Sequence, residues 1–458
     1  MKKTKILCTI GPASSDRGVL TRMHKAGMNG VRINTAFGTV DEYRKVADTI
    51  RKVADIPVLM DLKGPEIRLK CRNSIEVEKG GSVWIGSDKG DEVSFNRNIL
   101  SQLRIGDELL LNKGRVSAKV SAKKGGRIRL TVCEECVLKD GGGVNIPGRK
   151  LKIPTLSDND LDIIRLVKEL KLDYVALSFT RDERDIANLK RALGGYKAGI
   201  IAKIENQEGV DNADAILAAC DGLMIARGDL GIEIPPERIP LIQKDLINKV
   251  NRKGKLSIVA TEMLQSMENS PEPTRAETSD VANAILDGSD VVMLSGESAV
   301  GKYPVESVKT MTKIALEVET HMPRNTLAED IHDKIPLAMT RAVAAAIDTV
   351  DVDKIVVATR SGYTAMLISD SRIGKDIIAI TDDQAVCRRL HLVYAVTPAY
   401  HEYFKHSHRI LRIAKFCAKA GLVRKNDLVL FTAGLYTDKP TTNIVQLHRI
   451  DELLRYRG

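Results

Sequence analysis

The chain of 458 residues is poor in aromatic side chains and has no long apolar run. Aromatic residues make up 4% of it, and there is a single tryptophan. A surface on which nucleic-acid bases stack needs more of them, so we expect no nucleic-acid partner. No apolar run reaches the length of a membrane-spanning helix, and the first residues lead directly into a strand pattern. We therefore expect a cytoplasmic protein without a membrane partner.

Cysteine is also scarce. Seven cysteines are scattered along the chain, and only Cys133 and Cys136 form a C-x-x-C pair. No second pair and no nearby histidine completes a zinc site, so free thiols in a reducing compartment are the simpler interpretation. His401, His406 and His408 lie close in sequence without ligands in a recognisable spacing, and we interpret them as a surface cluster.

Long blocks of one charge sign are missing as well. The 70 basic and 60 acidic residues are interspersed and leave a net charge of +10. Anionic small-molecule ligands explain this excess as well as nucleic acid would. The length predicts two or three domains, and a hydrophobic content of 43% can fill several cores.

The chain does contain eight short apolar runs, each ending in glycine, proline or a polar residue. They cover residues 5–10, 29–34, 57–61, 174–178, 199–204, 222–226, 256–260 and 291–294. Helical patterns separate most of them. One helix is predicted after the start signal of Ser157 and Asp160. Its apolar stripe would consist of Leu161, Ile164, Leu166, Val167 and Leu170.

Eight strand and helix units predict an α/β fold of the (β/α)8 class, a TIM barrel. It would comprise residues 1–66 and 151–322. Between these parts, residues 67–150 show short alternating runs with glycine and lysine turns. This pattern predicts an inserted small β-barrel that lies as a lid over the active-site mouth.

Residues 323–458 resume the alternation of strands and helices. The expected strands lie near 354–358, 377–380, 428–431 and 444–447, and the expected helices near 336–349 and 408–421. We predict a C-terminal α/β domain with a small Rossmann-like sheet.

The most informative polar residues stand at the ends of two predicted barrel strands. Lys203 and Glu205 are two residues apart, so their side chains leave the same face of the strand. Asp229 follows the next strand, between glycines. A Lys-x-Glu pair is more often a solvated face or a plain ion pair, but the flanking isoleucines are too apolar for that. Two carboxylates, a lysine and exposed amides can hold a divalent metal and a phosphorylated anion.

One segment imitates a phosphate-binding P-loop. Residues 296–302 have its spacing and follow a strand, but Tyr303 stands where a Ser or Thr would hold Mg²⁺. We interpret this segment as the last loop of the barrel.

Eight motifs in order resemble those of pyruvate kinase, of the short archaeal or bacterial type, over the whole chain. They are KILCTIGPAS (5–14), MDLKGPEIR (60–68), GVNIPG (143–148), IIAKIENQEG (200–209), ARGDLGIE (226–233), ATEML (260–264), PTRAE (273–277) and MLSGE (293–297). The resemblance implies a kinase of glycolysis that transfers a phosphoryl group from phosphoenolpyruvate to ADP and so forms ATP and pyruvate. It also implies a homotetramer.

The resemblance assigns roles to the residues at the strand ends. Glu205 and Asp229 would hold Mg²⁺ or Mn²⁺, Lys203 would neutralise the phosphoryl group in flight, and Arg32 would grip the phosphate. Thr261 would relay the proton that is delivered to the enolate.

Further ligand contacts follow from the same resemblance. The Gly228 and Asp229 amides would bind the substrate carboxylate together with Thr261. Arg68 would meet the nucleotide phosphates with Arg32 and Asn34. These residues fall at predicted strand ends or just beyond, where barrel enzymes keep their chemistry.

A second phosphate site is expected in the C-terminal domain. Its residues are Thr359, Arg360, Ser361, Gly362 and Thr364, between a strand and a helical run. An ordinary Ser-Gly turn explains this sequence equally well, but amides at a helix start can cradle a phosphate. The resemblance favours a phosphorylated allosteric effector here, faced by the loop 437–443.

The chain departs from the family at the monovalent-cation site. Where the family has Phe-Ser-His-Gly after Asn34, this chain has Thr-Ala-Phe-Gly, so Ala36 lacks a cation-binding hydroxyl. Asn34, Asp61 and the carbonyl of Leu62 remain as candidate K⁺ ligands, and Glu66 keeps the charge that K⁺ would balance. We therefore expect a weakened dependence on K⁺.

The predicted lid also departs from the family. Asn112 and Lys113 replace a pair of aspartates, one of which closes onto the active site in the family, so closure must use another contact. Glu262 and Gln265 replace a Gln and a Glu, which preserves the local charge.

Two alternatives to an active kinase stay open at this point. One is a non-catalytic homologue that acts as a metabolite sensor, which the altered lid and cation site suggest. The other is an enolate-forming lyase on a related barrel, although such an enzyme needs neither the inserted lid nor the full series of motifs.

Overall fold

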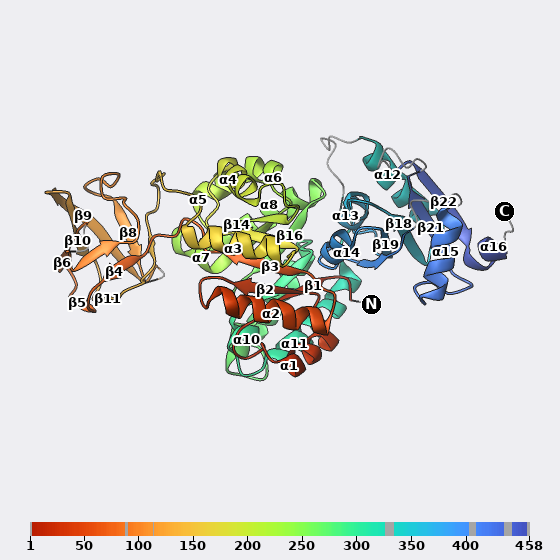
Figure 1. The fold of residues 1–458 in the computed structure, drawn as a ribbon, viewed down its shortest axis with the longest axis horizontal. Helices are drawn as coiled ribbons and strands as arrows, with labels where there is room; N and C mark the ends of the chain where they lie inside the picture. The colour runs from red at the N-terminus through yellow and green to blue at the C-terminus, as the bar shows by residue number, and fades with distance from the viewer. Residues whose placement is uncertain are drawn as a thin grey trace.

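The computed structural model describes residues 2–87, 90–112, 114–325, 334–402, 409–434 and 442–455. They form three parts in a row, with the inserted segment at one end, a barrel in the middle and the C-terminal domain at the other end (Figure 1). Lys113, His406, His408 and most of the loop 437–443 lie outside the described residues.

The middle part is a closed barrel of eight parallel strands in the order β1-β17-β16-β15-β14-β13-β3-β2, which confirms the predicted fold class. Its strands are β1 (Lys5–Thr9), β2 (Gly30–Asn34), β3 (Val58–Leu62), β13 (Tyr174–Leu177), β14 (Gly199–Ile204), β15 (Gly222–Ala226), β16 (Leu256–Ala260) and β17 (Val291–Leu294). Each corresponds to one of the apolar runs. Almost every strand residue is buried, because helices cover the outside and side chains fill the inside.

Helices surround this barrel. They are α1 (Arg17–Ala26), α2 (Val40–Val53), α3 (Asp158–Glu169), α4 (Glu183–Leu193), α5 (Gln207–Asp211), α6 (Ala213–Ala219), α7 (Arg227–Glu233), α8 (Ile239–Arg252), α9 (Arg275–Leu286), α10 (Gly296–Ala299) and α11 (Pro304–Val318). Ser157 and Asp160 form the predicted capping box of α3. The apolar stripe predicted for α3 was partly wrong, because Leu161 is 37% exposed and Ile163 is buried instead.

The inserted segment begins after β3 and returns to the barrel before β13. Its strands are β4 (Leu69–Cys71), β5 (Ile75–Val77), β6 (Ser82–Ile85), β7 (Val93–Phe95), β8 (Glu108–Leu111), β9 (Val116–Lys124), β10 (Arg127–Val132), β11 (Cys136–Leu138) and β12 (Val144–Asn145). They form a five-stranded antiparallel sheet, β12-β8-β9-β10-β6, and two pairs, β11-β5 and β4-β7, around one apolar core. The expected all-β segment is therefore present, but as three sheets, because several strands are too short to pair on both sides.

The C-terminal domain has a five-stranded sheet in the order β20-β19-β18-β21-β22, in which only β22 is antiparallel. Its strands are β18 (Lys354–Ala358), β19 (Asp376–Thr381), β20 (Val396–Tyr400), β21 (Leu428–Ala433) and β22 (Ile444–Arg449). Its helices are α12 (Lys334–Thr349), α13 (Tyr363–Asp370), α14 (Gln384–Leu390), α15 (Arg409–Lys419) and α16 (Ile450–Arg455). β20 was not predicted from the sequence; it contains Pro398 and lies at the sheet edge, where proline is tolerated.

The C-terminal domain closes the bottom of the barrel. Residues inside the barrel, such as Leu7 and Met224, share one apolar core with Leu392 and Tyr394 of the C-terminal domain. Arg388 pairs with Asp173 at 2.7 Å across the same junction. The carboxyl ends of the strands face the other way, toward the insertion (Figure 1).

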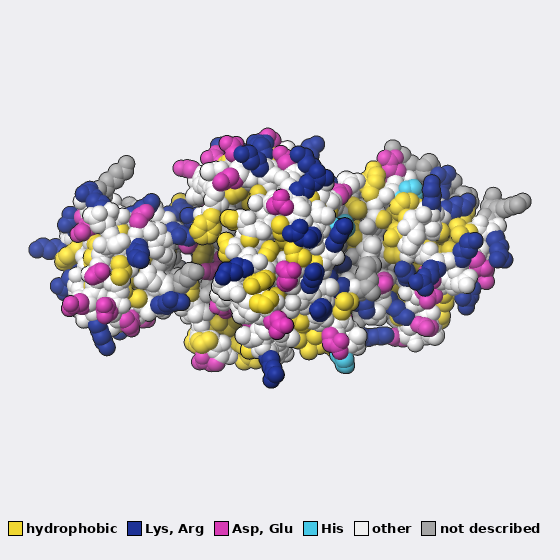
Figure 2. Space-filling model, turned by 90° about the horizontal axis from the view of Figure 1, so that it is seen from below, with side chains coloured by type: hydrophobic (Ala, Val, Ile, Leu, Met, Phe, Trp, Pro, Cys, Tyr) yellow, Lys and Arg dark blue, Asp and Glu magenta, His cyan; other side chains and the backbone are white. Residues whose placement is uncertain are grey.

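The remaining expectations concern ligands and surfaces. All seven cysteines are free, and no group of three His, Cys, Asp or Glu side chains among the described residues could hold a metal. His401 stacks on Phe416 with ring centroids 4.4 Å apart. Within the described ranges no helix is long and apolar enough to cross a membrane. Basic and acidic side chains are intermixed on the face seen in Figure 2.

Candidate active site

The barrel brings the predicted residues to its open mouth. Arg32 lies near the end of β2, Lys203 near the end of β14, and Thr261 directly after β16. Glu205 follows β14, and Asp229 is in the first turn of α7, which follows β15. Residues distant in sequence therefore meet because parallel strands end at one edge.

Asp61, in β3, is the centre of a buried charge network. Its Oδ2 atom lies 2.7 Å from both Nε and Nη2 of Arg32 and 3.2 Å from Nζ of Lys203. Arg32 also donates to Thr9 Oγ1 at 3.0 Å. Burial alone would raise the pKa of Asp61, but Lys203 and Arg32 outweigh it and hold that pKa below its ordinary value. Asp61 therefore fixes both cations at the mouth.

Lys203 stays protonated although it is buried. Its ammonium lies 2.9 Å from Glu205 Oε1 and donates to Ser178 Oγ at 2.7 Å. Burial lowers the pKa of Lys203, but Asp61 and Glu205 more than reverse this, so the pKa lies above its ordinary value. Lys203 is therefore a fixed, buried positive charge at the carboxyl end of β14, held by Asp61, Glu205 and Ser178.

Glu205 carries the most perturbed carboxylate of this network. Burial raises its pKa to about 7, Asp229 adds to the rise and Lys203 opposes it. Oε2 accepts the N–H of Phe179 at 2.7 Å, whereas Oε1 makes no aligned hydrogen bond in spite of its short distance to Lys203. A buried carboxylate oxygen whose one polar partner is the Lys203 ammonium, close to a second carboxylate, suits a hard divalent cation. Because Asp61 is already paired with Arg32 and Lys203, Glu205 and Asp229 are the carboxylates left for a metal, and water and substrate oxygens would complete the coordination.

Thr261 sits in strained backbone. Its φ is +69° and that of Glu262 is +54°, a left-handed conformation that side-chain-bearing residues rarely adopt. The Thr261 hydroxyl accepts the N–H of Gly228 at 2.8 Å and donates to the carbonyl of Ala260 at 2.6 Å. Two consecutive strained residues at a strand end are typical of functional sites.

Arg227 holds this strained segment, and sequence analysis missed it. Its Nη2 atom donates to the carbonyls of Thr261 at 2.8 Å and Glu262 at 3.1 Å. The same buried guanidinium pairs with Asp280 at 2.7 Å. The signal was an arginine placed directly after an apolar strand, but its partners lie more than thirty residues away in sequence.

Ser178 is the second residue that was missed. It follows β13 and bridges the network, since it accepts from Lys203 and donates to Asp61 Oδ1 at 3.2 Å. A polar residue at the end of a predicted barrel strand could have indicated it. The P-loop imitation is structural, because Glu297 accepts the N–H groups of Leu264 and Ser295.

The candidate K⁺ ligands lie side by side. Asn34 and Asp61 are register partners on β2 and β3, and Leu62 follows Asp61. The side chain of Asn34 accepts the N–H of Ala36 at 3.1 Å. Phe37, which replaces the family's histidine, is 76% exposed.

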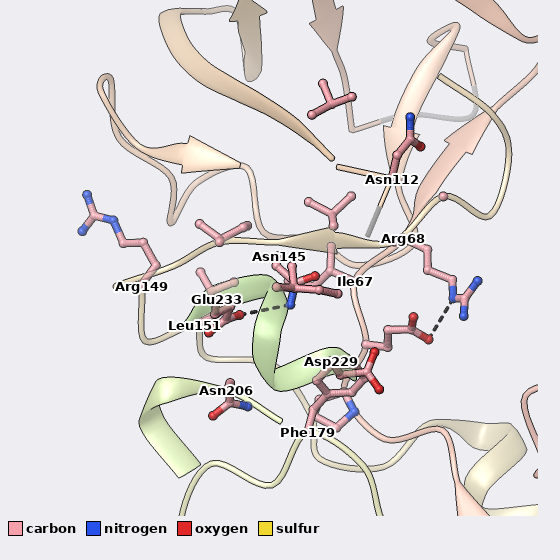
Figure 3. A pocket seen from close by; sticks show the side chains of 18 of the residues that line it. Ile67, Arg68, Asn112, Asn145, Arg149, Leu151, Phe179, Asn206, Asp229 and Glu233 are labelled. Carbon is pink, nitrogen blue, oxygen red and sulfur yellow. Dashed lines mark hydrogen bonds and ion pairs between the residues drawn. The ribbon is translucent and has the colours of Figure 1, made fainter. Parts of the chain in front are cut away.

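A cleft of about 1190 Å³ separates the barrel mouth from the insertion. Arg68, Asn112, Phe179, Asp229 and Glu233 line it (Figure 3). Arg68 pairs with Glu66 at 2.8 Å and donates to the carbonyl of Gly141. The cleft thus extends from Asp229 to Arg68, the predicted nucleotide-binding arginine, whereas Glu205, Lys203, Arg32 and Thr261 are not among the residues that line it.

The predicted effector loop connects β18 and α13. The N–H of Gly362, at φ +86°, donates to Thr359 Oγ1 at 2.9 Å, and the N–H of Tyr363 donates to Ser361 Oγ at 3.3 Å. Thr364 is buried and shares a hydrogen bond of 2.7 Å with Thr442. Arg360 and Ser361 are exposed.

Comparisons with known proteins agree with this arrangement. Residues 1–308 match the family described as pyruvate kinase, barrel domain, and residues 338–448 match pyruvate kinase, alpha/beta domain. The pyruvate kinase of Staphylococcus epidermidis is 41% identical over all of this chain and 82% of the relative, and that of Staphylococcus aureus strain USA300 is 39% identical over the same shares. A crystal structure of a Cryptosporidium parvum pyruvate kinase superposes with a TM-score of 0.89, 32% identity, and coverage of 98% of this chain and 96% of that one. The chain therefore belongs to the pyruvate kinase family.

Proposed function

We propose that the barrel mouth performs the pyruvate kinase reaction through Lys203, Arg32, Thr261, Glu205 and Asp229. Pyruvate kinase function follows from the family, whose members act on phosphoenolpyruvate and ADP. The observation that carries the assignment of residues is Lys203, a buried and protonated lysine held between Asp61 and Glu205 at the mouth.

In the first step, the bond between phosphorus and the enol oxygen breaks while a bond to a terminal oxygen of ADP forms. Lys203 and Arg32 stand where they can neutralise the transferring group, and their common contact with Asp61 fixes their spacing. Such preorganised charges provide most of the stabilisation in phosphoryl transfer.

Pyruvate kinases use a divalent metal, and we propose Mg²⁺ or Mn²⁺ held by Glu205 and Asp229. The metal would supply positive charge to the phosphate and enolate oxygens. The closeness of the two carboxylates, which together with burial raises the pKa of Glu205, supports this placement.

In the second step, carbon 3 of the enolate receives a proton. Thr261 is the proposed relay, because its hydroxyl is held between the Gly228 N–H and the Ala260 carbonyl. The Gly228 amide already donates to Thr261, so binding the substrate carboxylate at the Gly228 and Asp229 amides would require this hydrogen bond to be shared or released.

The nucleotide would bind in the cleft below the insertion, with its phosphates at Arg68, Arg32 and Asn34. The insertion would serve as the lid. We also propose a K⁺ site at Asn34, Asp61 and Leu62 that is weakened by Ala36, in which a cation would compete with the existing contacts of Asp61.

In the C-terminal domain, we propose that Thr359, Arg360, Ser361, Gly362 and Thr364 recognise a phosphorylated effector. The position of the loop at the start of α13 supports this, although the hydroxyls of Thr359, Ser361 and Thr364 are already bonded within the protein. A cytoplasmic homotetramer is the proposed form of the enzyme.

The test is a coupled assay for pyruvate from phosphoenolpyruvate, with and without ADP. The proposal expects pyruvate only when ADP is present. Pyruvate formed without ADP would indicate the lyase. No pyruvate under either condition would indicate a non-catalytic homologue, which no observation on the molecule favours.

A further inference from the structure

The last turn of α7 touches the insertion. Asn145, the last residue of β12, donates from Nδ2 to Oε1 of Glu233, the last residue of α7, at 3.1 Å (Figure 3). This contact joins the insertion to the helix whose first turn carries Asp229. Asp229 and Glu233 are four residues apart and both line the cleft, so they lie on one face of α7.

Glu233 also lies near the loop after β14 that carries Glu205, the other proposed metal ligand. The backbone N–H of Gln207, at the start of α5, lies near enough to the Glu233 carboxylate to oppose the rise that burial causes in its pKa. Gln207 lies two residues after Glu205. The half-buried side chain of Glu233 thus lies where the insertion, the loop after β14 and the end of α7 meet at the cleft, and its hydrogen bond to Asn145 joins α7 to the insertion.

A second contact lies beside the first. Gly114 of the insertion packs against Ile232, and a Cβ atom added to this glycine would lie 3.1 Å from Ile232 Cγ2. Its φ of +78° also favours glycine. The close approach of the two backbones is therefore built into the insertion.

Asn112, at the position of one of the family's lid aspartates, makes a different contact. Its side-chain amide points back into the insertion, toward the carbonyl of Val137 at 3.4 Å. Asn145 and Gly114 supply the contacts to the barrel side instead.

We propose that Glu233 is a positioning residue that latches the insertion to α7 and so ties the position of the lid to the loops carrying Glu205 and Asp229. The part that concerns the metal rests on the proposed function. Glu233 itself holds neither metal nor substrate; it acts by fixing the elements that do.

The chain contains its own reporter of lid motion. Trp84, the single tryptophan, lies on β6 of the insertion. Time-resolved fluorescence anisotropy of Trp84 therefore reports the mobility of the insertion without any turnover. Binding of Mn²⁺, followed by electron paramagnetic resonance, reports the metal site separately.

The variants are Asn145→Ala, Glu233→Ala, the double variant and Glu233→Gln. In Asn145→Ala and in Glu233→Ala we expect a larger fast component in the anisotropy decay of Trp84. The double variant should show no further increase, because both substitutions remove the same contact. Glu233→Ala should raise the Mn²⁺ dissociation constant about tenfold, as expected for the loss of a hydrogen bond to a charged group. Glu233→Gln should be intermediate, since its amide keeps an acceptor oxygen for Asn145 but loses the charge.

Matched controls are Asn98→Ala, an exposed asparagine of the same insertion, and Glu237→Gln, an exposed carboxylate just beyond α7. Both should leave the anisotropy and the Mn²⁺ affinity unchanged. An unchanged Trp84 decay in Asn145→Ala, additive effects in the double variant, or unchanged Mn²⁺ affinity in Glu233→Ala would overturn the proposal. If Glu233→Ala does not fold, Asn145→Ala and Glu233→Gln decide it.

These readouts separate the latch from the proposed function. A wild-type protein that forms no pyruvate, but whose variants change the anisotropy as expected, would refute the function and leave the latch intact. Normal turnover with unchanged anisotropy would do the reverse.

Discussion

The barrel mouth and the loop between β18 and α13 are both polar clusters at the carboxyl ends of parallel strands, but they differ in how their polar groups are satisfied. In the loop, Thr359 accepts from Gly362, and Thr364 shares a hydrogen bond with Thr442. At the mouth, Glu205 Oε1 has the Lys203 ammonium 2.9 Å away as its partner, and burial beside Asp229 still raises the pKa of Glu205 to about 7.

This difference separates two kinds of site. Burying a carboxylate beside a second carboxylate is costly, and Lys203 offsets this cost only in part, so a divalent cation at the mouth would stabilise the site. A loop whose hydroxyls already have hydrogen-bond partners within the protein is stable by itself, and an anion must compete with those bonds. We therefore expect catalysis to depend absolutely on the mouth and regulation to be a graded effect of the loop.

The largest expected effect is that of Glu205→Gln. The amide removes one of the two carboxylate charges that would bind the metal, and it places a hydrogen-bond donor near the Lys203 ammonium. Turnover should therefore vanish. Steady-state assays with Mg²⁺ and with Mn²⁺ measure it, and excess EDTA should silence the wild type in the same way. A rate that is indifferent to EDTA would show that the metal site is assigned wrongly.

The effector loop should give a graded change. A phosphorylated metabolite should lower the apparent KM for phosphoenolpyruvate, with a coupling of about 1 to 3 kcal/mol. Saturation curves with a panel of sugar phosphates and nucleotides measure this. The burial of Thr364 makes a charge there a stability defect, so exposed Ser361 is the better position to test.

Ser361→Glu should abolish the response by like-charge repulsion and spare unactivated turnover. Ser101→Glu, at an exposed site of the insertion, is the control. If no compound in the panel moves the curve, the loop returns to an ordinary Ser-Gly turn.

Arg227→Lys tests the strained segment at the mouth. The planar guanidinium of Arg227 holds the carbonyls of Thr261 and Glu262 together with Asp280, and a lysine ammonium cannot hold all three. Thr261 should therefore lose its alignment, and kcat should fall about tenfold. The solvent exchange of pyruvate methyl protons, followed by nuclear magnetic resonance, should slow with it. Asp280→Asn keeps an acceptor for Arg227 and should have a smaller effect. A normal exchange rate in Arg227→Lys would show that Arg227 does not align Thr261 for proton transfer.

Potassium should have the smallest effect. Without a hydroxyl at position 36, activation by K⁺ should be weak or should saturate only at high concentration. Ala36→Ser should lower the concentration required, as measured by assays over a K⁺ series at constant ionic strength. Strong activation of the wild type at low millimolar K⁺ would mean that another ligand replaces the missing one.

The sequence indicated the strands better than the contacts between them. All eight barrel strands were predicted because each is a buried apolar run with a clear end. β20 was missed because a proline at an edge strand is indistinguishable from a loop by pattern. Leu161 was placed in the helix stripe because apolar spacing does not distinguish a buried position from its neighbour.

At the site, residue types and strand ends predicted that Lys203, Glu205 and Asp229 would meet. Arg227, Ser178 and Glu233 were missed for a common reason. Each acts through partners that are distant in sequence, such as Thr261 for Arg227 and Asn145 for Glu233. Their importance arises only when the barrel and the insertion bring those partners together.

The most direct test of the account is the steady-state kinetics of Lys203→Met at saturating Mg²⁺ and ADP. Lys203 supplies a fixed charge that matters as the phosphoryl group moves, so kcat should fall by about a hundredfold or more with little change in the KM for phosphoenolpyruvate. Circular dichroism of the variant establishes that it is folded. A folded Lys203→Met enzyme with nearly normal kcat would contradict the central claim that this buried lysine drives phosphoryl transfer at the barrel mouth.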